Sequence, residues 1–327
     1  MKIIQHNEIG SPANVLKVVT QAAPALAAGE VRVKILATPI HPSNLLQISG
    51  HYGVAPQLPA IPGSEGAGQV VEVAPDVTHL KVGQRVLVTG GGTWRDELTG
   101  PAARFIALPD VGDIEQLSML TVNPLTALLI LNNFVALKAG DWIVQSAANS
   151  AVGEYVIQLA KQRNVKTINI VRRADLAAGL NALGADAVVV DGDDLKAQIN
   201  AVTGGAPISL AIDCVGGETF SRMVDSLSFG GTIVAYGALS MTPPKLNSVA
   251  VIFNDVRVRG FWLSKWFETA SQADKGAAFG QVIQLIASGA LKAKIDARFS
   301  LDEIGAAVAR AAESGRDGKV ILIPTPA

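Results

Sequence analysis

Small and polar residues from Ser146 to Gly153 follow the apolar stretch Trp142 to Gln145 and lead into a helical pattern. A strand, a turn and a helix in this order bring free backbone N–H groups and the positive end of a helix together, which suits the pyrophosphate of a dinucleotide. Of the usual G-x-G-x-x-G glycines, only the last is clear, as Gly153. Asn149 and Ser150 can cap the helix and contribute side-chain donors to phosphate instead. A capped helix that binds no ligand is the alternative interpretation.

Two adjacent arginines support the dinucleotide interpretation and indicate which cofactor is used. Arg172 and Arg173 follow the next apolar stretch, Thr167 to Val171, at about 20 residues after Gly153. A carboxylate at this place binds the ribose 2′-hydroxyl of NAD, whereas arginine accommodates the 2′-phosphate of NADP. We therefore predict NADPH as the cofactor. The alternative is two solvated arginines at the end of a strand.

The elements around this turn alternate between apolar strand candidates and helical patterns. Strands that are apolar on both faces and separated by helices are typical of a parallel, doubly wound α/β sheet. The six candidates are Trp142 to Gln145, Thr167 to Val171, Ala187 to Val190, Leu210 to Val215, Thr232 to Tyr236 and Val256 to Phe261. They predict a complete dinucleotide-binding domain over residues 121–264.

The first third of the chain has a different pattern, with short strand candidates broken by Gly and Pro and almost no helical periodicity. The candidates are Glu30 to Leu36, Gly68 to Val73, Arg85 to Val88 and Arg104 to Leu108. This pattern predicts a mostly β, barrel-like domain over residues 1–120.

The chain after Ser264 contains two helical patterns, Lys275 to Ser288 and Leu301 to Ser314, and a terminal strand candidate, Lys319 to Ile323. These elements are too few for a third domain. We therefore expect residues 265–327 to return to the first domain.

Composition excludes several classes of protein. The chain has 327 residues, a net charge of −1 and 17% charged residues, so it offers no overall basic field for nucleic acid or an anionic membrane. No apolar run reaches the length of about 18 residues that a membrane helix needs. The single cysteine excludes an intramolecular disulfide and a zinc site with several cysteines. The N-terminal segment Met1 to Gln5 is strand-like and lacks the features of a secretory signal, so we expect a cytoplasmic protein.

Several short segments then carry a specific resemblance by their order and spacing. They are His41-Pro42-Ser43-Asn44, Gly50-His51-Tyr52-Gly53, Gly92-Thr93-Trp94-Arg95, Val122-Asn123-Pro124, Asn149-Ser150-Ala151-Val152-Gly153, Asp213-Cys214-Val215-Gly216-Gly217, Tyr236-Gly237 and Arg259-Gly260-Phe261-Trp262-Leu263-Ser264. Together they resemble the zinc-free branch of the medium-chain dehydrogenase/reductase superfamily, which includes quinone oxidoreductases. Within this branch the chain looks most like the 2-enoyl thioester reductases of the mitochondrial type (trans-2-enoyl-CoA/ACP reductases). The resemblance implies a doubly wound parallel Rossmann sheet with a GroES-like, mostly β catalytic domain.

The resemblance also implies roles for individual residues. The family's catalytic tyrosine lies in a Gly-Asn-Tyr-Gly segment and matches Tyr52, with His51 in place of the asparagine. Trp94 is expected in the substrate pocket, although an ordinary core tryptophan is the alternative. The implied cofactor contacts are Asn123, Asn149, Ser150, Ala151, Val152, Gly153, Arg172, Arg173, Tyr236, Gly237, Ala238, Leu239, Phe261, Trp262, Leu263 and Lys319. For Lys319, a solvated terminal lysine is the alternative.

No metal is expected. Zinc dehydrogenases of this two-domain type hold the ion with Cys and His ligands, and Ser64 stands where they have a histidine ligand. Cys214 lies in a core-strand pattern. His41 and His51 have no partner at a recognisable ligand spacing, and a lone histidine is more often a surface or hydrogen-bonded residue.

The implied reaction is hydride transfer from NADPH to Cβ of an α,β-unsaturated thioester, with Tyr52 as donor to the thioester oxygen or to Cα. Two alternatives remain open: a quinone or alkenal reductase on the same fold, and a non-catalytic NADPH-binding protein. An acyl carrier protein is a possible partner of the thioester reaction. The resemblance, the edge strand Val256 to Phe261 and the apolar run Val249 to Phe253 together predict a homodimer.

Overall fold

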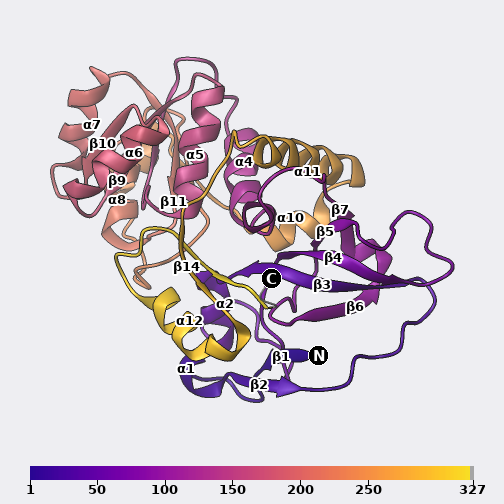
Figure 1. Ribbon diagram of the computed structural model, residues 1–327. Coiled ribbons are helices and arrows are strands. Elements are labelled where there is room, and N and C mark those ends of the chain that lie inside the picture. Colours follow the sequence, from indigo (N-terminus) through magenta and orange to yellow (C-terminus); the bar gives the residue numbers. More distant parts are fainter. Residues whose placement is uncertain (325–327) are drawn as a thin grey trace. The chain divides into compact units, whose positions relative to one another are not determined.

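The computed structural model describes residues 1–324, which form two compact units. The first unit contains Met1–Val122 and the chain from Phe279 onwards, and the second contains Asn123–Ala278 (Figure 1). Among the described residues, no helix combines the length and apolar character needed to cross a membrane. The mixed α/β class with one parallel sheet and one mostly β unit is confirmed.

A seven-stranded sheet forms the body of the first unit. Its strands, in spatial order, are β14 (Ile295–Phe299), β15 (Lys319–Leu322), β3 (Glu30–Pro39), β4 (Gly66–Val73), β5 (Arg85–Val88) and β7 (Phe105–Ala107), with β6 (Glu97–Pro101) also paired to β3. A separate antiparallel pair consists of β1 (Lys2–Gln5) and β2 (Lys17–Thr20). Strand β15 pairs antiparallel with the end of β3, so the C-terminal strand is part of the sheet of the first unit.

Short helices complete the first unit. They are α1 (Pro12–Val15), α2 (Pro42–Ile48), α3 (Ile114–Leu117) and α12 (Ile304–Ala312), with the 3₁₀ turns η1 (Ala102–Arg104) and η3 (Leu301–Glu303). Helix α12 packs beside β15 and α1 and closes one core of the unit, which includes Ile4, Trp94 and Val320. The longer α11 (Gln272–Ala287) contains the point where the two units join in sequence.

The second unit is built on a six-stranded parallel sheet. The spatial order is β10 (Ala187–Val190), β9 (Lys166–Val171), β8 (Trp142–Gln145), β11 (Ile208–Asp213), β12 (Thr232–Ala235) and β13 (Arg257–Gly260). All six strands predicted from the sequence are present. Chain order reverses between β8 and β11, and in open α/β sheets ligands bind at such a switch point, beyond the carboxyl ends of the strands.

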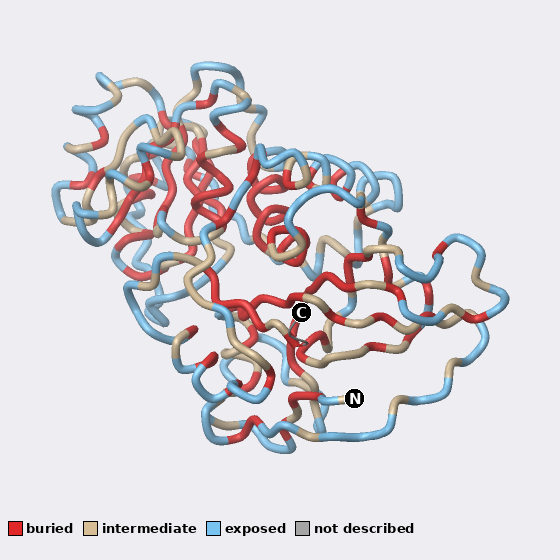
Figure 2. The backbone as a smooth tube through the Cα atoms, in the orientation of Figure 1, coloured by how far each residue is buried: buried red, intermediate tan, exposed pale blue. Residues whose placement is uncertain are grey.

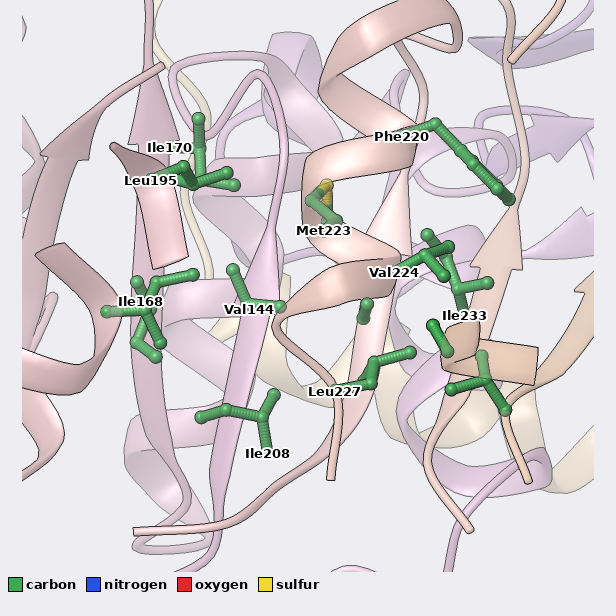
Figure 3. Close-up of a cluster of buried hydrophobic side chains, with 14 of the residues drawn as sticks. Val144, Ile168, Ile170, Leu195, Ile208, Phe220, Met223, Val224, Leu227 and Ile233 are labelled. Carbon is green, nitrogen blue, oxygen red and sulfur yellow. The ribbon is translucent and has the colours of Figure 1, made fainter. Parts of the chain in front are cut away.

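Helices cover both faces of this sheet. The helices of this unit are α4 (Asn123–Asn133), α5 (Ala151–Gln162), α6 (Ala177–Leu183), α7 (Leu195–Thr203), α8 (Gly217–Asp225), α9 (Ser248–Asn254) and α10 (Leu263–Thr269), with the 3₁₀ turn η2 (Ala174–Leu176) before α6. Figure 3 shows the core on the α7 and α8 side, where Phe220, Met223 and Val224 face strand residues such as Val144 and Ile233.

Burial explains why these strands could be recognised in the sequence. In Figure 2 the central strands β8, β9, β11 and β12 are mostly buried along their length, because helices cover the sheet on both sides. Apolar residues are therefore frequent along these strands and are not restricted to alternate positions. The two edge strands differ, because β10 is mostly only partly buried and all four residues of β13 are exposed.

Candidate cofactor and substrate site

The turn between β8 and α5 has the local structure of a phosphate-binding turn. Ser150 caps α5, and its Oγ accepts a hydrogen bond from the Gly153 N–H at 3.2 Å. Ala147 adopts a positive φ of 44°, which an L-residue rarely does. A Cβ atom at position 153 would lie 2.5 Å from the Ala148 carbonyl oxygen, so only glycine lets the helix start this close to the turn. The structure therefore gives a physical reason for the one glycine that the sequence motif retains.

A buried carboxylate ties this turn to the neighbouring strand end. Asp213, at the end of β11 and 0% exposed, accepts hydrogen bonds from Ser146 Oγ at 2.6 Å and from the backbone N–H groups of Val215 and Gly216. Ser146 Oγ in turn accepts the Cys214 N–H at 3.1 Å. The carboxyl ends of β8 and β11 are thus locked together at the switch point of the sheet.

The loop after β12 lies against the same turn. The hydroxyl of Tyr236 contacts the side chains of Ser150 and Cys214. Burial raises the pKa of Tyr236 well above its usual range, and Cys214 adds to this effect while Ser150 opposes it. A Cβ atom at position 237 would lie 3.0 Å from the Cys214 carbonyl oxygen, so Gly237 permits a close approach of the two loops. Burial also raises the pKa of the Cys214 thiol to about 11, which makes it unreactive at neutral pH.

The two predicted cofactor-selecting arginines lie beyond the end of β9 and are exposed. Arg173 Nε is 3.2 Å from Asp175 Oδ1, in a surface pair with both side chains more than half exposed. Such a pair contributes little to stability, so it leaves Arg173 available for a phosphate. Within the described chain, no carboxylate forms an ion pair with Arg172.

Asn123, the first residue of α4, is 6% exposed, and its Nδ2 has no hydrogen-bond partner within residues 1–324. The hydroxyl of Thr121, two residues earlier, is also buried without a partner in the described chain. Leaving a buried polar group unpaired costs about 1–3 kcal/mol, and a ligand that supplies the missing partner removes that cost. This orphaned amide fits the cofactor contact expected at Asn123.

A buried ionic cluster lies in the first unit. Glu65 is 0% exposed, and its Oε1 is 2.7 Å from Nε2 of His41. Because a carboxylate only accepts hydrogen bonds, this nitrogen of His41 carries the proton. Glu65 Oε2 accepts the backbone N–H groups of Thr121 at 2.5 Å and Val122 at 3.1 Å.

Lys319, the first residue of β15, is buried beside this cluster. Burial lowers the pKa of its ammonium to about 8, with Glu65 opposing and Arg316 adding to the shift. Burial and the nearby Lys319 likewise lower the pKa of His41, against the influence of Glu65. The alternative of a solvated terminal lysine does not hold.

The remaining predicted residues occupy different surroundings. Tyr52 is partly buried in the irregular segment after α2. Trp94, expected in the substrate pocket, is 0% exposed and packs in the core of the first unit, where its Nε1 donates to the Pro39 carbonyl. A fully enclosed ring supports its loop from within instead of presenting a surface to a substrate.

The last predicted cofactor segment follows β13 in the second unit. Phe261 meets Phe134 edge to face at 6.2 Å, Trp262 is 45% exposed and Leu263 begins α10. The second unit therefore brings together the turn after β8, the Tyr236 loop and the end of β11. Tyr52, Trp94 and Lys319 belong to the first unit.

Sequence reasoning missed the residues that organise the site. Glu65, Asp213 and Thr121 were not singled out as functional, and His41 was treated as a lone histidine. The available signal for Asp213 was an acidic residue at the end of an apolar stretch, shortly before two adjacent glycines. For Glu65, the signal was a carboxylate directly before the buried first half of strand β4.

No metal cluster occurs in the described chain: residues 1–324 contain no group of three or more His, Cys, Asp or Glu side chains that could hold an ion. Ser64, at the position of the family's histidine ligand, accepts a hydrogen bond from Asn44 Nδ2 at 2.7 Å.

Comparisons with known proteins agree with this architecture. Residues 27–110 match the alcohol dehydrogenase GroES-like domain, and residues 151–279 match the domain model described as zinc-binding dehydrogenase. The human mitochondrial enoyl-[acyl-carrier-protein] reductase is 35% identical over 329 residues, which cover 98% of this chain and 88% of the human protein.

Solved structures of enoyl thioester reductases and quinone oxidoreductases are also similar to this chain. The mitochondrial 2-enoyl thioester reductase heterodimer of Candida tropicalis superposes with a TM-score of 0.90 at 28% identity, covering 98% of this chain and 99% of that chain. One of its subunits is also known in complex with NADP and crotonyl-CoA. A mycobacterial quinone oxidoreductase gives a TM-score of 0.84 at 27% identity, covering 99% of this chain and all of that one. The chain therefore belongs to the zinc-independent branch of the medium-chain dehydrogenase/reductase superfamily.

Proposed function

We propose that this protein uses NADPH to reduce the carbon–carbon double bond of trans-2-enoyl thioesters. The observation that carries the proposal is the 35% identity to an enoyl-[acyl-carrier-protein] reductase over 98% of the chain. The glycine-dependent turn at the switch point of the parallel sheet supports it independently, because that turn suits a dinucleotide.

Each part of the cofactor has a matching group in the chain. The turn after β8 provides backbone N–H groups for the pyrophosphate, and the exposed Arg172 and Arg173 provide charge for the 2′-phosphate. The amide of Asn123 and the ammonium of Lys319 provide further donors. The nicotinamide end is assigned to Tyr236, Gly237, Ala238, Leu239, Phe261, Trp262 and Leu263. When bound, NADPH supplies the hydride.

The protein's own chemical task is to stabilise charge on the substrate and deliver a proton. Addition of a hydride to Cβ moves negative charge onto the thioester oxygen, and Cα then gains a proton. Tyr52 donates a hydrogen bond to that oxygen or the proton to Cα, since a phenol O–H is a hydrogen-bond donor. In this proposal residues 1–120 and 265–327 form the catalytic domain and residues 121–264 the NADPH domain.

The experiment that tests the reaction is a turnover panel with NADPH and crotonyl-CoA, a quinone and a simple enone. The proposal expects the thioester to have the highest kcat/KM. A preference for the quinone, which the similarity to quinone oxidoreductases makes the second candidate, would replace the thioester assignment. Absence of turnover with all three would indicate a non-catalytic NADPH-binding protein.

Tyr52→Phe tests the assigned donor. Turnover of crotonyl-CoA should fall about 10²–10⁴-fold, the range for loss of a positioned acid, while NADPH affinity stays near the wild-type value. Tyr155→Phe is the matched control, because Tyr155 is one of only three tyrosines and is fully buried in α5. Normal crotonyl-CoA turnover in Tyr52→Phe would rule out this mechanism.

We also propose that the protein is a homodimer formed through the second unit. Edge strand β13 is exposed along its length, and the neighbouring α9 presents Val249, Ile252 and Phe253, each at least 61% exposed. An unpaired strand edge beside exposed apolar side chains is a typical protein interface. Delivery of the substrate by acyl carrier protein and a cytoplasmic location are further parts of the proposal.

A further inference from the structure

Among the buried ionisable side chains of the first unit, Lys319 has a role in the proposed NADPH binding, whereas Glu65 and His41 have none. Glu65 is 0%, His41 2% and Lys319 7% exposed. Charged groups are rarely buried unless they are paired or hydrogen-bonded, because removal from water disfavours the charge. Glu65 meets this condition fully, since both of its carboxylate oxygens have hydrogen-bond partners.

Glu65 is itself held rigidly. Its backbone carbonyl accepts hydrogen bonds from the hydroxyls of Thr38 at 2.7 Å and Thr93 at 2.8 Å. The preceding residue, Ser64, is held by Asn44, whose side-chain oxygen also accepts the His41 N–H. The glutamate therefore presents its carboxylate from a fixed position.

The target of this carboxylate is the backbone directly before α4. Oε2 of Glu65 accepts the N–H groups of Thr121 and Val122, the last two residues before the helix begins at Asn123. N–H groups at a helix entry have no partner within the helix, so an external carboxylate fixes the path of the entering chain. Glu65 thereby determines the backbone from which the Asn123 side chain projects.

The same segment carries the two orphaned side-chain atoms. Its backbone N–H groups are satisfied by Glu65, whereas Nδ2 of Asn123 and Oγ1 of Thr121 are buried without a partner in the described chain. A neutral amide and a hydroxyl suit neutral groups of a dinucleotide, such as its carboxamide or ribose hydroxyls. The backbone N–H groups of Thr121 and Val122 therefore have a partner, whereas the side chains of Thr121 and Asn123 each keep a polar atom that a ligand could pair with.

We propose that Glu65 is a positioning residue for NADPH binding, which holds the Thr121–Val122 backbone so that the Asn123 amide is presented to the cofactor. The inference rests on the proposed NADPH function. Glu65 touches neither cofactor nor substrate in this role, and acts only through the segment that it holds.

The first test is the NADPH dissociation constant of Glu65→Ala, measured by fluorescence titration. It should rise about 10–100-fold, the scale of effects from misplacing a binding group. Glu65→Gln should rescue binding to within about threefold, since its amide oxygen still accepts the two N–H groups. Its NH2 can donate to Nε2 of His41 once the ring proton moves to Nδ1. Unchanged affinity in Glu65→Ala would overturn the inference.

A matched control separates positioning from loss of structure. Gln116 is also buried and clamps a backbone segment of the first unit, with hydrogen bonds to the N–H and carbonyl of Ala293 at 2.9 Å each. Gln116→Ala should lower the thermal midpoint as Glu65→Ala does, yet leave NADPH affinity unchanged. Equal loss of affinity in both variants would show a merely structural role.

A double-mutant cycle with Asn123→Ala identifies the route of the effect. If Glu65 acts through Asn123, the Glu65→Ala/Asn123→Ala protein should bind NADPH no more weakly than the weaker single variant. Effects that multiply would overturn the inference and leave the cofactor assignment intact. Unchanged NADPH affinity in Asn123→Ala alone would instead contradict the proposed cofactor contact itself.

Hydrogen–deuterium exchange of the wild-type protein provides a measurement that needs no variant to fold. The amides of Thr121 and Val122 should exchange slowly without NADPH, because Glu65 holds them, and saturating NADPH should slow the peptide that contains residues 121–126 further. Exchange of this peptide that is unaffected by NADPH would overturn the inference.

Discussion

Replacing Lys319 with methionine should stabilise the protein at neutral pH, and the gain should disappear in alkaline solution. Lys319 is 7% exposed and faces Glu65, His41 and Arg316. Burial lowers the pKa of its ammonium from 10.5 to about 8, so the folded protein binds this proton more weakly than the unfolded chain does. Methionine has a similar length and no charge to desolvate.

The expected size follows from the two pKa values. A difference between 10.5 and about 8 corresponds to about 3 kcal/mol of unfolding free energy, at 1.36 kcal/mol for each unit. Below about pH 8 both states are protonated and the folded protein bears the full cost. Between about pH 8 and 10.5 only the unfolded chain keeps the proton, so stability rises with pH. The destabilising cost of burying the Lys319 ammonium is therefore absent above pH 10.5, grows as the pH falls, and is fully present below about pH 8.

The assay is chemical denaturation of wild type and Lys319→Met, without cofactor, at intervals from pH 7 to 10.5. Groups common to both proteins cancel in the difference between their unfolding free energies. This difference should favour Lys319→Met by up to about 3 kcal/mol at pH 7 and shrink toward zero at the alkaline end. Lys265→Met, at an exposed ion pair with Glu268, controls for the loss of one lysine. A difference that stays constant across the range would refute the reasoning.

Three further predictions concern the cofactor, metal and assembly. Replacing Arg172 and Arg173 with glutamine should raise the KM for NADPH at least about tenfold and leave that for NADH nearly unchanged, since each charge-assisted hydrogen bond contributes about 1.5–3 kcal/mol; equal initial affinity for both cofactors would contradict the assignment. Activity should persist in a chelator, and elemental analysis should find no stoichiometric zinc; one tightly bound ion per chain would contradict this. Ile252→Lys, which places a charge on the exposed face of α9, should convert a dimer into monomers in light scattering, whereas a wild-type monomer at micromolar concentration would exclude the dimer.

The sheet of the second unit was predictable because its central strands are enclosed on both sides. β8 and β10 have the bounds that the sequence predicts, and the other four strands differ only at their ends. Such strands occur in the sequence as short, largely apolar stretches between helical patterns. They can be predicted without knowing which strands pair or in what register. Edge strand β13 was predicted as an apolar candidate like the others, although all four of its residues are exposed.

The ionic cluster of the first unit was not predictable, because it depends on pairing between strands that are not adjacent in sequence. His41, Glu65 and Lys319 are far apart in sequence and meet because β15 pairs with β3 and β3 pairs with β4. Register between non-adjacent strands leaves no local signal, so His41 resembled a lone histidine and Lys319 a terminal lysine. The burial of Trp94 has the same origin, because the ring packs against Ile4 and Val320 from both ends of the chain.

Ser64, which stands where the zinc dehydrogenases have a histidine ligand, is part of a hydrogen-bond network. Ser64 accepts a hydrogen bond from Asn44, and Asn44 accepts the N–H of His41, whose ring contacts Glu65. The position at which zinc dehydrogenases bind metal is thus part of a hydrogen-bonded frame around a buried carboxylate. A reductase without a metal must stabilise the enolate with hydrogen-bond donors, and such donors act only when they are held in place before the reaction. In the proposed reaction that donor is Tyr52, whereas we infer that the frame around Glu65 holds the segment leading into Asn123, the proposed cofactor contact. This frame occupies the place where the zinc-dependent relatives bind their metal.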